Sequence, residues 1–173
     1  MTTDHTRFEQ FVEFSAVLTG FSRLDLIGTG VASDYCQTLK SAAGEAVLDR
    51  MLDRFVQLKD QHSGLDDLEA AVQKEFWNDA TFGPVSQNIV LMWYSGQWNQ
   101  LPPDWHKANG SDPGDTTHIV SAAAYQEGLV WRAAGTHPQG AKQPGYGTWS
   151  FPPVQIAVDT GKRTKAAQAG RGK

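Results

Sequence analysis

The apolar residues of the first 94 positions recur at intervals of three and four, and this spacing constrains the fold more than any other feature. Phe8, Phe11 and Phe14 begin one apolar stripe along a helix that ends at Gly20. The same period returns in four later segments, each bounded by residues that start or stop helices. We therefore predict helices over residues 8–20, 25–40, 44–60, 63–77 and 82–95.

The sequence changes character after Tyr94. Residues 95–115 are rich in glycine, proline and asparagine, so we expect a long turn-rich segment there. One further helix is predicted over residues 116–133, followed by an extended arm rich in proline, glycine and aromatic residues over 134–158. For a chain of 173 residues, this pattern predicts an all-α fold with a single domain of about six helices, which spans residues 1–158 and includes the arm.

Charge is distributed unevenly along the chain. Residues 159–173 carry five Lys or Arg and one acidic residue, which leaves a net charge of −8 on the preceding residues. An acidic body argues against nucleic acid as the main partner, and the small, polar, basic tail is expected to be disordered. No apolar run approaches the ~20 residues that span a bilayer, and no secretory signal precedes Phe8.

No pattern in the sequence predicts a catalytic, cofactor-binding or metal site. The "GTG" of residues 28–30 lacks the rest of a dinucleotide fingerprint, and a kink or close helix packing explains it better. None of the five histidines pairs with another histidine, a cysteine or a carboxylate at a spacing typical of metal ligands, such as H-x-x-x-H. We expect Asp115 to cap the helix that follows it rather than to act with His118 in catalysis. Cys36 is expected to be a buried, inert thiol.

Five of the six tryptophans lie between Trp93 and Trp149, where regular structure is least expected. The block "WYSGQW" at residues 93–98 has three interpretations: part of the core, anchors for a protein partner, or a stacking surface for carbohydrate. The arm favours the second interpretation. A proline-rich segment forms few backbone hydrogen bonds, so its order must come from packing its aromatic side chains on a surface, and another chain can supply that surface.

Three segments are informative together: "FVEFSAVLTGFSRLD" (Phe11 to Asp25), "IVLMWYSGQWNQLP" (Ile89 to Pro102) and "SAAAYQEGLVWRAAGTHPQGAKQPGYGTWSFPP" (Ser121 to Pro153). In order and spacing they resemble the small subunit of membrane-bound, flavin-dependent sugar and polyol dehydrogenases. This is the sorbitol dehydrogenase small-subunit family, related to the small subunits of fructose and flavin-dependent glucose dehydrogenases. The most specific pieces are "LTG", "WYSGQW" and "GAKQPGYGTW", and the likeness covers most of residues 8–153.

The resemblance implies that this chain holds no cofactor and no catalytic residue. In such enzymes a large subunit of the glucose–methanol–choline (GMC) type carries FAD and oxidises the sugar or polyol. A cytochrome c subunit with haem c, or an iron–sulfur cluster, passes the electrons on towards quinone. The small subunit binds the large one and supports its folding, maturation and stability. The resemblance implies a periplasmic complex that meets the membrane only as a whole. Because no twin-arginine signal precedes Phe8, a cytoplasmic complex is the alternative.

We expect the interface with the FAD-containing subunit to consist of aromatic side chains and two polar residues of the arm. The expected interface residues are Trp93, Tyr94, Trp98, Trp105, Tyr125, Trp131, Lys142, Gln143, Tyr146 and Trp149. Among them, Trp93 and Trp131 lie on predicted helices and are the ones most suited to the chain's own core. The alternative function is a stand-alone carbohydrate-binding module that uses the tryptophan-rich loops. An independent enzyme is the least favoured reading.

Overall fold

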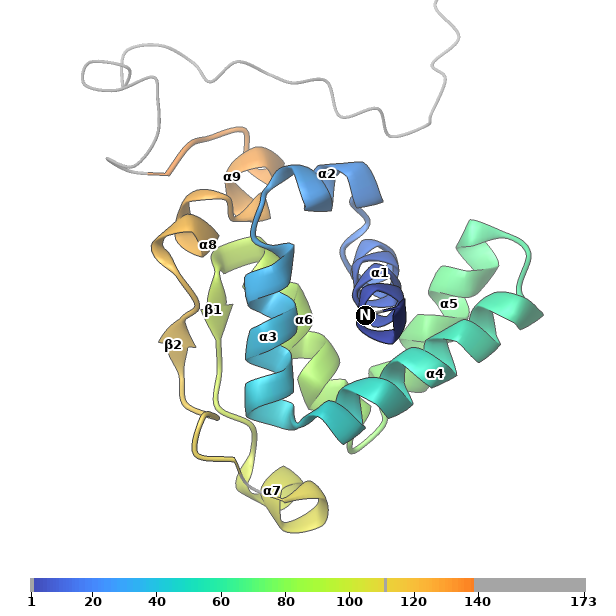
Figure 1. The fold of residues 1–173 in the computed structure, drawn as a ribbon. Helices are drawn as coiled ribbons and strands as arrows, with labels where there is room; N and C mark the ends of the chain where they lie inside the picture. The colour runs from blue at the N-terminus through green and yellow to red at the C-terminus, as the bar shows by residue number, and fades with distance from the viewer. Residues whose placement is uncertain (1, 111, 139–173) are drawn as a thin grey trace, which may run out of the picture.

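The computed structural model describes residues 2–110 and 112–138, and this part of the chain is mostly helical (Figure 1). The helices are α1 (Thr2–Thr19), α2 (Arg23–Gly28), α3 (Ala32–Ala43), α4 (Glu45–Gln61), α5 (Leu65–Phe76), α6 (Phe82–Ser95), α7 (Pro103–Asn109), α8 (Ala122–Gln126) and α9 (Leu129–Ala133). The strands β1 (Gln97–Trp98) and β2 (His118–Ile119) pair antiparallel, with Gln97 opposite Ile119. The all-α class predicted from the sequence is confirmed.

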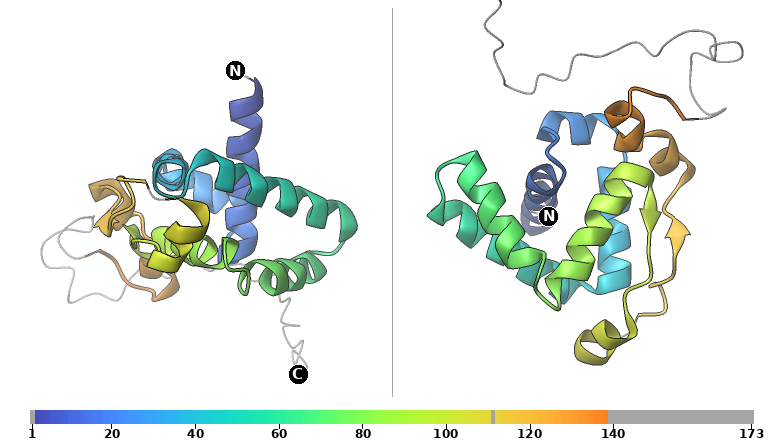
Figure 2. Two further views of the ribbon diagram at one scale, coloured as in Figure 1. Left: turned by 90° about the horizontal axis from the view of Figure 1, so that it is seen from below. Right: turned by 180° about the vertical axis from the view of Figure 1, so that it is seen from behind.

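The core lies where α1 crosses α4 and α5, a crossing visible in the left view of Figure 2. Phe14 of α1 is fully buried, and its ring lies 5.1 Å from that of Phe55 and 4.9 Å from that of Phe76, measured between centroids. Burying such a side chain contributes about 1.5–3 kcal/mol. The buried apolar face of α4 consists of Val47, Leu48, Met51, Leu52, Phe55 and Leu58. These are the residues whose spacing predicted the helix.

The helix predicted over residues 25–40 is divided into α2 and α3 by the "GTG" segment. Gly30 has a φ of +75°, a left-handed backbone conformation that glycine adopts without the steric strain that other residues incur. The Thr29 hydroxyl donates a hydrogen bond to the Leu26 carbonyl at 2.6 Å and occupies one of the free acceptors at the end of α2. The segment therefore acts as a helix break, which places α2 across the end of α3 in Figure 1.

The region after α6 also differs from the prediction. Within the expected turn-rich segment, α7 forms because Pro103 occupies its first turn, where a missing N–H costs nothing. The helix predicted over residues 116–133 is not formed as one element, and β2, α8 and α9 take its place. The Ser121 hydroxyl caps α8 by accepting a hydrogen bond from the Ala124 N–H, and Gly128 separates α8 from α9.

Two glycines allow α8 and α9 to pack directly against the end of α6. A Cβ atom on Gly96 would lie 2.6 Å from the Ala124 carbonyl carbon, and one on Gly128 would lie 2.7 Å from the Tyr94 carbonyl oxygen. Both distances are shorter than any van der Waals contact. The backbones therefore approach as closely as they do because neither position carries a side chain.

The described helices do not combine the length and apolar character that crossing a bilayer requires. Most of the predicted arm, from Gln139 onward, and the predicted tail over residues 159–173 lie outside the described residues.

Candidate protein-binding surface

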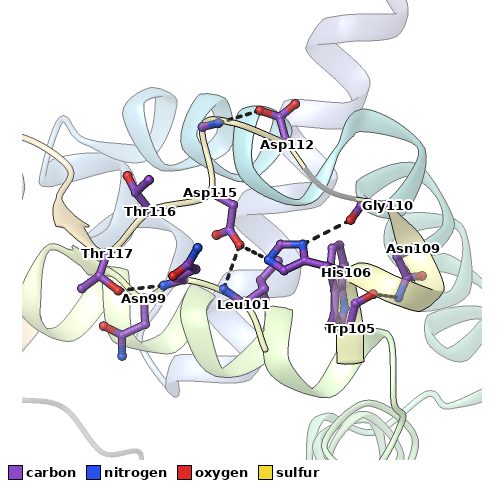
Figure 3. Close-up of polar contacts among 12 residues, drawn as sticks. Asn99, Leu101, Trp105, His106, Asn109, Gly110, Asp112, Asp115, Thr116 and Thr117 are labelled. Atoms are coloured by element: carbon purple, nitrogen blue, oxygen red, sulfur yellow. Dashed lines mark hydrogen bonds and ion pairs between the residues drawn. The ribbon is translucent and has the colours of Figure 1, made fainter. Parts of the chain in front are cut away.

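A buried carboxylate organises the segment between α6 and α8. Asp115 is the one charged side chain that is buried among the described residues, with 2% of its surface exposed. Its carboxylate accepts hydrogen bonds from the Trp98 indole N–H at 2.6 Å and from the Leu101 backbone N–H at 2.8 Å. The same carboxylate lies 2.9 Å from Nε2 of His106 on α7 (Figure 3). We call these four residues the Asp115 cluster.

This geometry corrects the predicted role of Asp115. No helix begins after it, because residues 118 and 119 pair with β1 instead. Asp115 therefore caps no helix; it connects β1, the loop before α7, and α7 itself. A buried carboxylate is tolerated only when hydrogen-bond donors surround it, and the N–H groups of Trp98 and Leu101 are such donors.

The arrangement of His106 is that of a structural residue. Its Nε2 faces Asp115, and its Nδ1 lies 3.2 Å from the Gly110 carbonyl oxygen (Figure 3). In a catalytic His–Asp pair the second ring nitrogen faces the nucleophile or the substrate. Here the chain's own backbone occupies that position. Among the described residues, no group of three or more His, Cys, Asp or Glu side chains is placed to hold a metal ion.

Three of the tryptophans expected at an interface belong to the interior of the chain. Trp93, Trp98 and Trp105 are all buried. The ring of Trp93 packs edge-on against Tyr35, with centroids 4.8 Å apart. The indole N–H of Trp105 donates to the Thr81 carbonyl at 2.8 Å. Buried indoles offer a partner no contact area, and they present no flat face on which a sugar ring could stack.

Aromatic side chains do reach the surface at the end of the molecule where α1, α2, α6, α8 and α9 meet (Figure 1). Phe21, Tyr94, Tyr125 and Trp131 are each half-buried. The Tyr94 hydroxyl donates to the Thr19 carbonyl at 3.2 Å, and its ring lies edge-on to Phe21 with centroids 6.0 Å apart. These contacts hold the end of α6 against the turn between α1 and α2.

The pair Tyr125 and Trp131 continues this surface over α8 and α9. The two rings meet edge-on with centroids 5.5 Å apart, and the Trp131 indole N–H donates to the Tyr125 carbonyl at 2.8 Å. Gly128, which separates the two residues in sequence, packs against the Tyr94 backbone carbonyl, so α8 and α9 lie directly against the end of α6. Rings fixed in this way lose little side-chain entropy when a partner covers them, which favours binding.

Arg132 completes the surface electrostatically. Its guanidinium lies 5.7 Å from the centroid of the Phe21 ring and donates to the Asp25 carboxylate at 2.8 Å. The hydroxyl of Ser22, and next the guanidinium of Arg132, lower the pKa of the Asp25 carboxyl. Asp25 therefore stays ionised, and the ion pair that joins α9 to α2 persists, to a lower pH than for an isolated aspartate. Phe21, Tyr94, Tyr125, Trp131 and Arg132 are called the aromatic surface below.

Sequence reasoning found only part of this surface. Tyr94, Tyr125 and Trp131 were expected at an interface, whereas Phe21 and Arg132 were not. Phe21 lies between two helices and breaks no periodic pattern, so only its tertiary contact with Tyr94 reveals its role. Four further expected residues lie outside the described residues: Lys142, Gln143, Tyr146 and Trp149.

Two shallow depressions elsewhere are lined mostly by charged side chains that have partners. One lies between α4, α5 and the start of α6, where Arg54 donates to Glu75 at 2.7 Å. The other lies between α1, α3 and α4, where Lys40 donates to Asp4 at 2.9 Å. Neither contains an unpaired buried charge that would select a small ligand.

The fold and this surface define a small, mostly helical protein in which four half-buried aromatic side chains, those of the aromatic surface, lie where α2, α6, α8 and α9 meet. No protein-family model, curated protein or solved structure matches the chain significantly. The resemblance to a dehydrogenase small subunit therefore rests on the three sequence segments alone, and it remains a prediction.

Proposed function

We propose that this chain is a non-catalytic small subunit that binds, matures and stabilises a GMC-type, FAD-dependent sugar or polyol dehydrogenase. The observation that carries the proposal is that residues of the three resembling segments contact one another in the folded chain. Thr19, Phe21 and Asp25 belong to the first of the three segments behind the resemblance, Tyr94 to the second and Arg132 to the third. Segments about a hundred residues apart in sequence thus meet at the aromatic surface.

The composition of this surface suits a protein partner. Tyrosine, tryptophan and arginine are over-represented among the residues that dominate the binding energy of interfaces. Tyr125 and Trp131 would supply rigid apolar area, and Arg132 a charge already fixed by Asp25. The arm residues named above would extend this contact.

In this proposal, the buried tryptophans support the surface from within the chain. Trp98 is held by the Asp115 cluster, and β1 joins that cluster to the end of α6, where Tyr94 lies. The chain would supply no group to the redox chemistry. FAD in the large subunit would accept the electrons, and haem c or an iron–sulfur cluster elsewhere in the complex would pass them on.

Co-expression tests the proposal. The chain would be produced with a GMC-type flavoprotein from the same genome and separated by size-exclusion chromatography, with absorbance followed for protein and for flavin. We expect the chain to co-elute with the flavin. We also expect the same flavoprotein, expressed alone, to be insoluble or inactive.

Two outcomes would contradict the proposal. One is a colourless monomer beside a flavoprotein that is fully active without it. The other is a saturable change in tryptophan fluorescence when sugars are added to the lone chain, which would favour the carbohydrate-binding alternative.

A further inference from the structure

Helix α2 carries an exposed apolar ridge. Leu24 and Ile27 stand one turn apart on this helix, with 81% and 46% of their surfaces exposed, while Leu26 between them is fully buried in the core. The half-buried Phe21 continues the same spacing of three on the side of α1. A single exposed apolar residue is ordinary, but adjacent ones beside a half-buried ring form a patch that another group can cover. We call Leu24 and Ile27 the α2 ridge.

The chain leaves its last described helix next to this ridge. Figures 1 and 2 both show α9 beside α2, and Arg132 binds Asp25, the residue between Leu24 and Leu26. The described residues end at Pro138, five positions after α9. Whatever follows is therefore tethered close to the ridge.

The residues that follow have the composition to cover it. Fourteen positions beyond Arg132 comes Tyr146, followed by Trp149 and Phe151. At about 3.3 Å per extended residue, fourteen residues reach over any part of a six-residue helix. A short tether also holds a segment at an effective concentration in the millimolar range, so even a weak apolar contact is populated.

We propose that the segment of residues 146–151 packs on the α2 ridge of its own chain, with Tyr146 and Trp149 against Leu24 and Ile27. The arm would then lie next to the aromatic surface before any partner arrives. Ordering the arm in advance lowers the entropy cost of a later association. The inference stands on the exposed ridge and on the position of the chain, and it does not depend on the proposed function.

The test uses the full chain with labelled methyl groups, studied by NMR spectroscopy in the absence of other proteins. We expect nuclear Overhauser effects between the ring protons of Trp149 or Tyr146 and the methyl groups of Leu24 and Ile27. The full-chain variant Trp149→Leu should remove the indole contacts and shift those methyl resonances. Leu65 is the matched control: it is a leucine with 63% exposure on α5, and its methyl resonances should not move.

Three results would overturn the inference. The first is the absence of ring contacts to the methyl groups of both Leu24 and Ile27 in the unaltered chain. This result does not depend on whether the variant folds. The second is a methyl shift that depends on protein concentration, which would assign the ridge to a second copy. The third is a ridge that acquires aromatic contacts only when the flavoprotein is added, which would assign it to the partner.

Discussion

At the scale of single residues, Asp115 shows how one buried charge can order a segment that has little regular structure. The segment from Gln97 to Ile119 contains three prolines and several turns, so its backbone makes few repetitive hydrogen bonds. The carboxylate compensates by accepting from Trp98 and Leu101 and by lying 2.9 Å from Nε2 of His106, so it joins three different points of the segment. Its removal would leave the N–H groups of Trp98 and Leu101 without an acceptor.

We expect Asp115→Ala to lower the free energy of unfolding by about 2–6 kcal/mol, because it leaves the buried N–H groups of Trp98 and Leu101 without an acceptor, at a cost of about 1–3 kcal/mol each. Urea denaturation followed by circular dichroism measures this change. The control is Asp112→Ala in the same loop: Asp112 is exposed and accepts from the Gly114 N–H, so its loss should cost no more than about 1 kcal/mol. Equal effects of the two variants would show that the Asp115 cluster has no special role.

Cys36 provides a prediction about pH. Burial raises the pKa of its thiol, so less of the reactive thiolate is present at a given pH than in the unfolded chain. We expect a disulfide reagent to modify the native chain far more slowly than the chain in urea, and the native rate to rise only at higher pH.

Linkage fixes the sign of the accompanying change in stability. Between the ordinary pKa of a thiol and the raised native pKa of Cys36, the unfolded state loses a proton that the folded state keeps. The thiol therefore makes the free energy of unfolding fall as the pH rises through this window, and Cys36→Ala should lack that contribution. Native modification as fast as modification in urea would contradict the burial of the thiol.

At the scale of elements, the sequence predicts helices that bury a regular face and fails where the partner of a segment is distant. The apolar spacing of α4 is a local property and is read directly from its residues. His118 and Trp98 are paired across the two antiparallel strands although they lie twenty positions apart, and no local pattern around His118 predicts this pairing. The three residues that contact the Asp115 carboxylate lie 9 to 17 positions before it, so no local pattern around Asp115 predicts them, and a helix cap is the local interpretation.

Gly96 allows this element-scale packing to be tested against a matched glycine. Gly20 and Gly96 each follow a helix with a φ of +74°, so an alanine at either position pays the same backbone strain, about 1–2 kcal/mol. Only at Gly96 would the added Cβ meet a neighbour, the Ala124 carbonyl on α8. We expect Gly96→Ala to destabilise the chain by about 1–3 kcal/mol more than Gly20→Ala in urea denaturation. A difference near zero would mean that α8 moves away at no cost.

At the scale of the whole molecule, side chains that lie far apart in the sequence contact one another at the aromatic surface. Tyr94 bonds to Thr19 across 75 positions, and Arg132 bonds to Asp25 across 107 positions. Aromatic residues that suit an interface can be picked out from the sequence, because tryptophan and tyrosine stand out in any composition. Their division into buried and surface groups could not, because it depends on how β1 and α7 fold back to bury Trp98 and Trp105.

The aromatic surface makes a final prediction that separates binding from stability. Trp131 and Trp77 are both half-buried, but only Trp131 belongs to the surface; Trp77 ends α5. Each change to alanine removes a half-buried indole, so both variants should lose stability, and Trp131→Ala also removes the hydrogen bond to the Tyr125 carbonyl. If the proposed flavoprotein partner co-elutes with the chain, only Trp131→Ala should weaken their complex, by about 2 kcal/mol or more, as expected for a central anchor. Calorimetric titration at a temperature where both variants keep their full helix content measures this difference.

If the two variants bind equally well, the partner does not contact α9, and the surface that joins α2, α6 and α9 serves only to hold those helices together.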